Sequence, residues 1–169
     1  MPTSITFAEF LNQLFSGFNL AVLGAALAAL LACMGSAKGV GLVGEAASGL
    51  LSEDPSKFGK ALILNALPGT QGIYGFITAF MILYKTGFFS SGMSVSITQA
   101  QGLFYLIAGL PIGIVGLYSG IKQGRVAASG ISLIAKRPDE VGKAITSAAL
   151  VETYAIFALL VSLLLIALA

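Results

Sequence analysis

The chain has 169 residues, of which 57% are hydrophobic and only 9% are charged. A soluble domain typically carries roughly 25% charged residues, and no core of this length could hide so much apolar surface. The composition therefore excludes an ordinary soluble protein, and a net charge of +2 without a basic cluster gives no sign of nucleic-acid binding.

Four apolar stretches predict four membrane-spanning helices, because each is long enough to cross about 30 Å of hydrocarbon. They run approximately over residues 16–44, 59–85, 100–134 and 141–168. We therefore expect an all-α membrane protein of two tandem helical hairpins, the first in residues 1–85 and the second in residues 86–169.

Glycine is concentrated in the first and third of these helices. The first ends in the segment GSAKGVGLVG, the third carries seven glycines between residues 102 and 130, and the fourth has only Gly142. Small residues let membrane helices approach closely, so we expect the first and third helices to be the crowded pair and the fourth to lie outside. Such crowding fits the inner wall of a ring and a compact monomeric bundle equally well.

The second helix contains the polar segment LPGTQGIYGF. Four of its residues are spaced at i, i+3, i+4 and i+7 and so share one helical face: Leu67, Thr70, Gln71 and Tyr74. Pro68 has no N–H to donate and clashes with the turn before it, which frees a backbone carbonyl inside the membrane. An ion, a water molecule or a neighbouring helix can satisfy that carbonyl.

The fourth helix holds one acid, Glu152, in the run ALVETYAIFALL, and no other charged side chain follows Ala144. A carboxylate near the bilayer centre costs roughly 3 kcal/mol or more unless it is compensated, and such acids mark ion or proton paths. We therefore interpret Glu152 as functional. Threonine, glutamine and tyrosine in membrane helices more often serve as hydrogen-bonding contacts between helices.

The two halves of the chain repeat in the same direction. PSKFGKA at residue 55 returns as PDEVGKA at residue 138, and eight of the 23 positions from Pro55 to Ile77 are identical 83 residues later. Because each half contributes two helices, both hairpins enter the membrane with the same orientation. Glu152 aligns with Gly69 and, through the related segments EAASGLL and VAASGIS, Gln123 aligns with Leu42, so only the second half carries the carboxylate.

Basic residues gather at two of the three connections. Only Lys85 lies near the second connection, whereas the first and third are flanked by Lys57, Lys60, Lys136, Arg137 and Lys143. The positive-inside rule therefore predicts that the loops at residues 45–58 and 135–140 are cytoplasmic and that both termini lie on the opposite side.

The polar residues of three helices fall at one depth. Counting from the two predicted turns puts Thr70, Gln123 and Glu152 about 21–24 Å into the membrane. The available ligands are then a carboxylate, two carboxamides, a hydroxyl and a freed carbonyl, a set of oxygens that hard cations prefer. One negative charge balances one monovalent cation. A proton would need only the carboxyl, so the neutral oxygens beyond that requirement favour Na⁺ over H⁺. Tyr74 is placed to donate its hydroxyl to Glu152.

The segments GSAKGVGLVGEAA, LPGTQGIYGF, GIKQGRVAASG and VETYAI resemble the proteolipid subunit that forms the membrane rotor ring of V-type ATPases, most closely its bacterial sodium-pumping branch. The resemblance covers nearly the whole chain beyond residue 18. It implies a homo-oligomeric ring in the cell membrane, in contact with lipids, a stator membrane subunit and central-stalk subunits. It also implies a Na⁺ site at the Leu67 carbonyl, Thr70, Gln71, Gln123 and Glu152, with Tyr74 and Pro68 in support.

Other interpretations stay open at this point. A proton-carrying proteolipid of the same architecture would need only Glu152. A small four-helix transporter also uses a membrane glutamate, but it is expected to be a dimer with an aromatic pocket, and this chain has no tryptophan. A membrane scaffold without transport is the third alternative. The chain has no G-x-x-x-x-G-K-[ST] motif, so we expect it not to hydrolyse ATP by itself.

Overall fold

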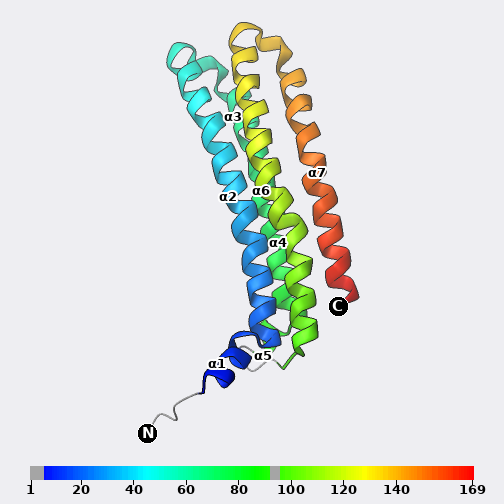
Figure 1. The fold of residues 1–169 in the computed structure, drawn as a ribbon. Helices are drawn as coiled ribbons and strands as arrows, with labels where there is room; N and C mark the ends of the chain where they lie inside the picture. Colours follow the sequence, from blue (N-terminus) through cyan, green and yellow to red (C-terminus); the bar gives the residue numbers. More distant parts are fainter. Residues whose placement is uncertain (1–5, 92–95) are drawn as a thin grey trace.

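The computed structural model describes residues 6–91 and 96–169, which form an elongated helical bundle (Figure 1). Four spans within these residues are long and apolar enough to cross a membrane, as the sequence predicts. They are α2 (Gly17–Glu53), the continuous rod of α3 (Phe58–Ala66), η2 (Leu67–Gly69) and α4 (Thr70–Lys85), then α6 (Gln99–Lys136) and α7 (Val141–Leu168).

Two short helices lie at the end of the bundle where the chain begins. α1 (Phe7–Leu14) precedes α2, and α5 (Phe88–Ser91) follows α4. A capping box starts α1: the Glu9 N–H donates to the Thr6 hydroxyl at 3.3 Å, and the Thr6 N–H donates to the Glu9 carboxylate at 2.8 Å. Figure 1 shows α1 leaving the line of the bundle, so it contributes nothing to the polar centre.

The first connection is much shorter than expected. The sequence places a loop at residues 45–58, but α2 continues to Glu53 because this stretch is rich in alanine and leucine, which favour helix. Ala47 and Leu50 are also buried against the rest of the bundle, which stabilises the added turns. Asp54 then ends the helix, and the 3-10 turn η1 (Pro55–Lys57) leads directly into α3.

The two hairpin turns have the same backbone geometry. Asp54, the last residue before η1, has φ −139° and ψ 87°. Arg137, the last residue before η4 (Pro138–Glu140), has φ −138° and ψ 81°. Each is followed by a proline that opens a 3-10 turn, so the turns correspond at the separation of 83 residues that the sequence repeat indicates.

The glycine-rich helices α2 and α6 pack closely along the bundle, as their composition predicts. A Cβ atom built on Gly35 would lie 2.6 Å from the Gly116 carbonyl oxygen, and one on Gly120 would lie 2.7 Å from the Gly35 carbonyl carbon. No side chain fits at such distances, so glycine at these positions is what allows the two backbones to meet.

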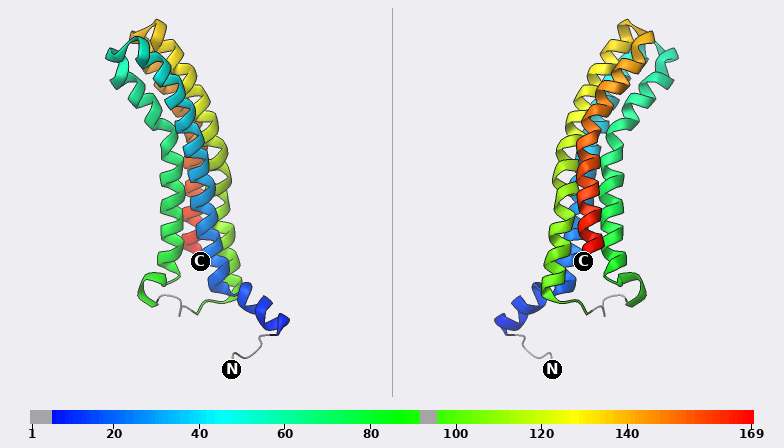
Figure 2. Two further views of the ribbon diagram at one scale, coloured as in Figure 1. Left: turned by 90° about the vertical axis from the view of Figure 1, so that its left-hand side faces the viewer. Right: turned by 90° about the vertical axis from the view of Figure 1, so that its right-hand side faces the viewer.

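The outer helices complete the bundle. α4 lies against α2, α6 and α7, and α7 packs mainly on α6. Both turns lie at one end of the bundle and both described chain ends at the other, so the two hairpins run in the same direction (Figure 1). Figure 2 shows that the α3–α4 rod bends along its length. The bend accompanies η2, where Pro68 cannot donate a helical hydrogen bond.

Candidate ion-binding site

Glu152 lies in the middle of α7 and is held by two polar side chains from other helices. The Tyr74 hydroxyl of α4 donates to its Oε1 atom at 2.6 Å, and the Gln123 amide of α6 donates to its Oε2 atom at 3.3 Å. Glu152 itself is partly buried, and neither of the two ion pairs found within the described residues includes it. The carboxylate is therefore fixed by neutral donors rather than by a basic partner.

Gln71 of α4 extends this network inward. Its Nε2 atom donates to the Gln123 Oε1 atom at 2.5 Å and to the Ser119 hydroxyl at 3.3 Å. Both glutamine side chains are fully buried, yet the Gln71 Oε1 atom has no hydrogen-bond partner. An unpaired buried acceptor costs about 1–3 kcal/mol, so this oxygen is a natural ligand for a cation or a bound water molecule.

The Leu67 carbonyl and Thr70 occupy the adjacent 3-10 turn. The Thr70 hydroxyl donates to the Leu67 carbonyl oxygen at 3.1 Å, and the Thr70 N–H donates to the same oxygen. This is the 3-10 pattern of η2, because in a regular α-helix the Leu67 carbonyl would accept from the residue after Thr70. Neither group bonds directly to Glu152 in this arrangement.

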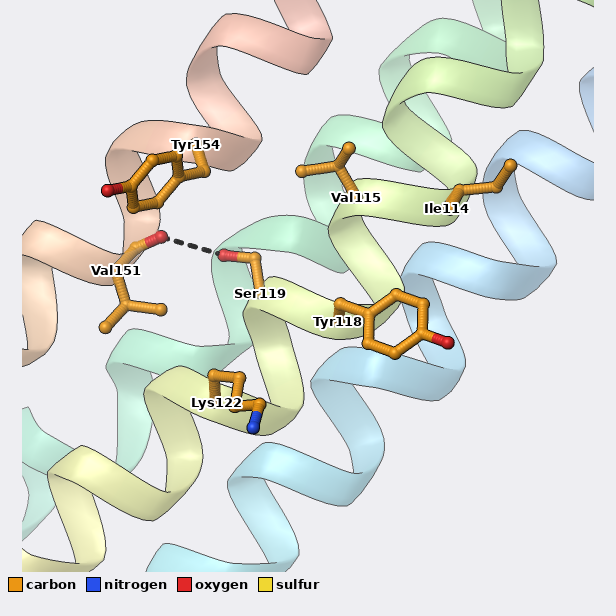
Figure 3. Close-up of a pocket in the computed structure, with 7 residues that line it drawn as sticks. All are labelled: Ile114, Val115, Tyr118, Ser119, Lys122, Val151 and Tyr154. Atoms are coloured by element: carbon orange, nitrogen blue, oxygen red, sulfur yellow. Dashed lines mark hydrogen bonds between the residues drawn. The ribbon is translucent and has the colours of Figure 1, made fainter.

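Two serines that were not among the predicted site residues also contribute to the site. Ser119 bridges α4 and α7: its hydroxyl accepts from Gln71 and donates to the Val151 carbonyl at 3.0 Å (Figure 3). Ser36 of α2 accepts from the Gly72 N–H at 2.8 Å, next to Gln71 in the chain. Ser119 lies four residues before Gln123 on the same helical face, a spacing from which its role could have been inferred.

The chemical character of the site follows from these donors. The described residues contain no cluster of three or more His, Cys, Asp or Glu side chains that could hold a metal ion. The polar centre instead offers one carboxylate together with amide, hydroxyl and carbonyl oxygens. Such a set balances a single positive charge and gives little affinity for transition metals.

A bundle of two parallel hairpins, with a lone acid in the middle of an apolar helix long enough to span a membrane, is the architecture of a membrane proteolipid. The family model of the C subunit of ATP synthase matches residues 23–82 and again residues 106–165, once in each hairpin. The chain therefore belongs to the family of the ATP synthase C subunit, in a form with two copies of the hairpin in one polypeptide.

Known relatives of the chain include subunits of V-type ATPases and of an A-type ATP synthase. It is 53% identical to the V-type sodium ATPase subunit K of Enterococcus hirae over 89% of this chain and 92% of that protein. It is 40% identical to the A-type ATP synthase subunit K of Methanocaldococcus jannaschii over 87% of this chain and 61% of that protein. Identity to the 16 kDa proteolipid of the human V-type proton ATPase is 27%, over 70% and 72% of the two chains.

Proposed function

We propose that this chain is the rotor-ring subunit of a V-type ATPase and carries one Na⁺ ion per subunit across the membrane. The proposed ligands are the Leu67 carbonyl, Thr70, Gln71, Gln123 and Glu152, with Tyr74 and Pro68 in support. The observation that carries this proposal is the fully buried Gln71 Oε1 atom, which has no partner although it belongs to the network around a lone carboxylate.

The donor set supports Na⁺ rather than H⁺ as the cargo. Protonation would neutralise Glu152 but would leave the Gln71 oxygen unsatisfied, whereas a cation uses both groups. A half rotation of an amide exchanges its oxygen and nitrogen, so the Gln123 side chain can present either a donor to Glu152 or an oxygen ligand to a cation. The 53% identity to a subunit of a sodium ATPase supports the same cargo.

Charge balance explains why the ion must travel with the subunit. A bare carboxylate is costly in hydrocarbon, but a carboxylate with one bound Na⁺ is neutral and can rotate through the lipid. At the stator subunit, contact with water and a fixed positive group releases the ion. Each Na⁺ moved against a membrane potential of 100 mV costs about 2.3 kcal/mol, which rotation driven through the central stalk must supply.

The proposed assembly has a defined direction. The turns at η1 and η4 face the cytoplasm, where the central-stalk subunits bind, and both termini face the other side. The subunits form a homo-oligomeric ring surrounded by membrane lipids. ATP hydrolysis takes place on other subunits, and this chain is not catalytic by itself.

Carbodiimide labelling tests the cargo directly. The reagent modifies a protonated, accessible carboxyl, so Na⁺ bound at Glu152 should protect it at neutral pH. We expect labelling of the purified subunit, followed by intact mass, to fall as Na⁺ is raised and to be unaffected by the same concentration of choline. Labelling that is insensitive to Na⁺ would contradict the proposal and indicate proton transport.

A further inference from the structure

The short helix α1, which takes no part in the polar centre, is amphipathic. Its large apolar residues are spaced at i, i+3, i+4 and i+7 and so share one face: Phe7, Phe10, Leu11 and Leu14. Glu9, Asn12 and Gln13 occupy the opposite face. The helix thus separates apolar and polar side chains as completely as eight residues allow.

The apolar face of α1 is uncovered. Phe7 is 76% exposed, Phe10 is 51% exposed and Leu14 is 49% exposed, and within the described part of the chain no residue of α1 is buried. A helix of eight residues is not stable by itself in water, even when its ends are capped. The apolar face therefore needs an environment that the described chain does not provide.

Aromatic and basic residues mark the membrane surface at the same end of the bundle. Tyr84 and Lys85 end the second span, and the Tyr84 side chain is 63% exposed. Phe18, in the first turn of α2, stacks on Phe88 of α5 with ring centroids 6.1 Å apart, which puts the start of α2 level with the end of α4. Tyrosine and lysine at the end of a span are typical of the boundary between hydrocarbon and water. α1 ends four residues before Phe18 and so lies at this boundary.

The apolar side of α1 continues the lipid-facing surface of the bundle. Figure 2 shows α1 turning sideways from the end of α2, on the side away from α4. Phe15, directly after α1, lines a hollow of about 490 Å³ together with Leu20 of α2 and with Leu103 and Leu106 of α6. Leu103 is itself 48% exposed. Gln13, from the polar face of α1, lines a different hollow, so the two faces of the helix meet different surroundings.

We infer that α1 lies in the plane of the membrane surface at this end of the bundle, with Phe7, Phe10, Leu11 and Leu14 in the leaflet and the opposite face in water. An acyl chain of the same leaflet fills the hollow beneath Phe15. This position is the one that short amphipathic helices take at the boundary between head groups and acyl chains. The inference needs only a membrane-embedded bundle, so it stands independently of the proposed cargo and ring.

Burial of apolar surface, rather than charge, holds α1 at the membrane. Glu9 is its only charged residue, and the Glu9 carboxylate accepts from the Thr6 N–H and the Thr6 hydroxyl, both at 2.8 Å. Because α1 has no basic residue, anionic lipids add no attraction. The direct connection to α2 keeps the helix at a high effective concentration beside the leaflet, so a weak intrinsic affinity is sufficient.

The surface position of α1 determines which part of α2 lies in hydrocarbon. α2 has 37 residues. At about 1.5 Å per residue it is roughly 55 Å long, whereas the hydrocarbon core is about 30 Å thick, so its length alone leaves its depth undetermined. A helix held in the surface plane directly before Gly17 stops α2 from sliding further into the membrane.

Spin labelling tests the position of α1. In a Cys33→Ser background, the full chain is reconstituted in phosphatidylcholine nanodiscs and labelled at Phe10→Cys or Leu14→Cys, with Asn12→Cys and Gln13→Cys as the matched pair on the polar face. The labels at 10 and 14 should be relaxed more by O₂, which concentrates in lipid, than by a water-soluble nickel chelate. The labels at 12 and 13 should show the reverse, and added phosphatidylglycerol should change neither result.

Two results of the spin-label experiment would overturn the inference. Equal access of the nickel chelate to all four labels would place α1 in water. Shielding of the labels at 10 and 14 from both reagents would show that protein, such as a second copy of this chain, covers the apolar face.

Hydrogen exchange in the same nanodiscs tests what stabilises the helix. Phe10→Asn combined with Leu14→Asn should lower the protection factors of the α1 amides about tenfold or more, because the helix loses its place in the leaflet. Asn12→Ser combined with Gln13→Ser, on the polar face, is the control and should leave protection unchanged. Unaltered protection of α2 and α6 shows that the bundle stays folded. Full protection of α1 in the Phe10 and Leu14 variant would contradict the inference.

Discussion

The two hairpins share a plan but supply different parts of the polar centre. At the same position of the repeat, the first has Pro68 and Gly69, and the second has Val151 and Glu152. In the first hairpin, the 3-10 turn η2 interrupts the α-helical pattern between α3 and α4 and offers carbonyl and hydroxyl oxygens. In the second hairpin, α7 continues as a regular helix that carries the acid.

Duplication of the hairpin allows the acid and the neutral polar groups to come from different helices. A single hairpin would have to place the acid and the neutral ligands on the same two helices. With two copies, Gln71 and Tyr74 come from one hairpin and Gln123 and Glu152 from the other, and they meet between them. Each chain then has one carboxylate at the polar centre for its two hairpins, so under the proposed function a ring would carry one ion for every two hairpins.

Removal of the acid should have the largest effect. Glu152→Gln leaves the second hairpin, like the first, without a charge at the polar centre, so a bound Na⁺ ion loses its counter-charge. We expect no retention of ²²Na⁺ by the purified ring and no Na⁺ transport by the reconstituted complex. Glu45→Gln, on the exposed side of α2, is the control and should bind Na⁺ normally.

Gln71→Leu should give the next largest effect, since it removes the unpaired oxygen of the first hairpin. We expect Na⁺ affinity to fall about 10- to 100-fold, as for loss of a hydrogen-bond-strength contact to a charge. Leu removes the unpaired Gln71 oxygen but leaves the buried Gln123 Oε1 atom without its donor, so thermal stability in Na⁺-free buffer should be similar or lower. Gln99→Leu at the exposed start of α6 is the control, and unchanged affinity in Gln71→Leu would exclude this residue as a ligand.

Tyr74→Phe should weaken binding more modestly. The substitution gives the first hairpin the residue that the second has at this position, Phe157, and removes the 2.6 Å hydrogen bond to Glu152. Na⁺ affinity measured by isothermal titration calorimetry should fall about threefold to tenfold, because the carboxylate is held less firmly. Tyr84→Phe, in the same helix but 63% exposed, should change nothing.

The smallest effect concerns the two turns. Hydrogen bonds from Ser56 and the nearby Lys57 ammonium hold the pKa of Asp54 below its usual range. A lowered pKa means that the ionised acid stabilises the folded turn above about pH 4, and that this contribution is lost as the pH falls through the folded-state pKa. The protection factor for amide hydrogen exchange at the end of α2, which corrects for the intrinsic effect of pH on exchange, should therefore fall on acidification. The end of α6 should show no such step, since Arg137 replaces Asp54. An equal fall in protection at both ends would contradict this explanation.

Much of the fold was predictable because membrane helices are encoded locally. The apolar stretches set the four spans, and glycine content identified α2 and α6 as the crowded pair. Helical rise alone placed Gln123 and Glu152 at one depth, and the structure brings them within hydrogen-bond distance. The face shared by Gln71 and Tyr74 likewise points toward them.

The remaining features depend on tertiary contacts that no local pattern contains. The extension of α2 to Glu53 follows from burial of Ala47 and Leu50 against other helices. For that reason the predicted loop over residues 45–58 was too long, because residues 45–53 belong to α2. The role of Ser119 depends on the rotation of α6 relative to α4 and α7, and the Thr70 bond to the Leu67 carbonyl depends on the 3-10 turn.

The most direct test is a density map of the detergent-solubilised oligomer, determined with and without Na⁺ at a resolution that reveals ions. The account predicts a peak between the Gln71 oxygen and the Glu152 carboxylate that is present only with Na⁺. A Glu152 side chain directed toward lipid, or identical density at this position in both maps, would contradict it.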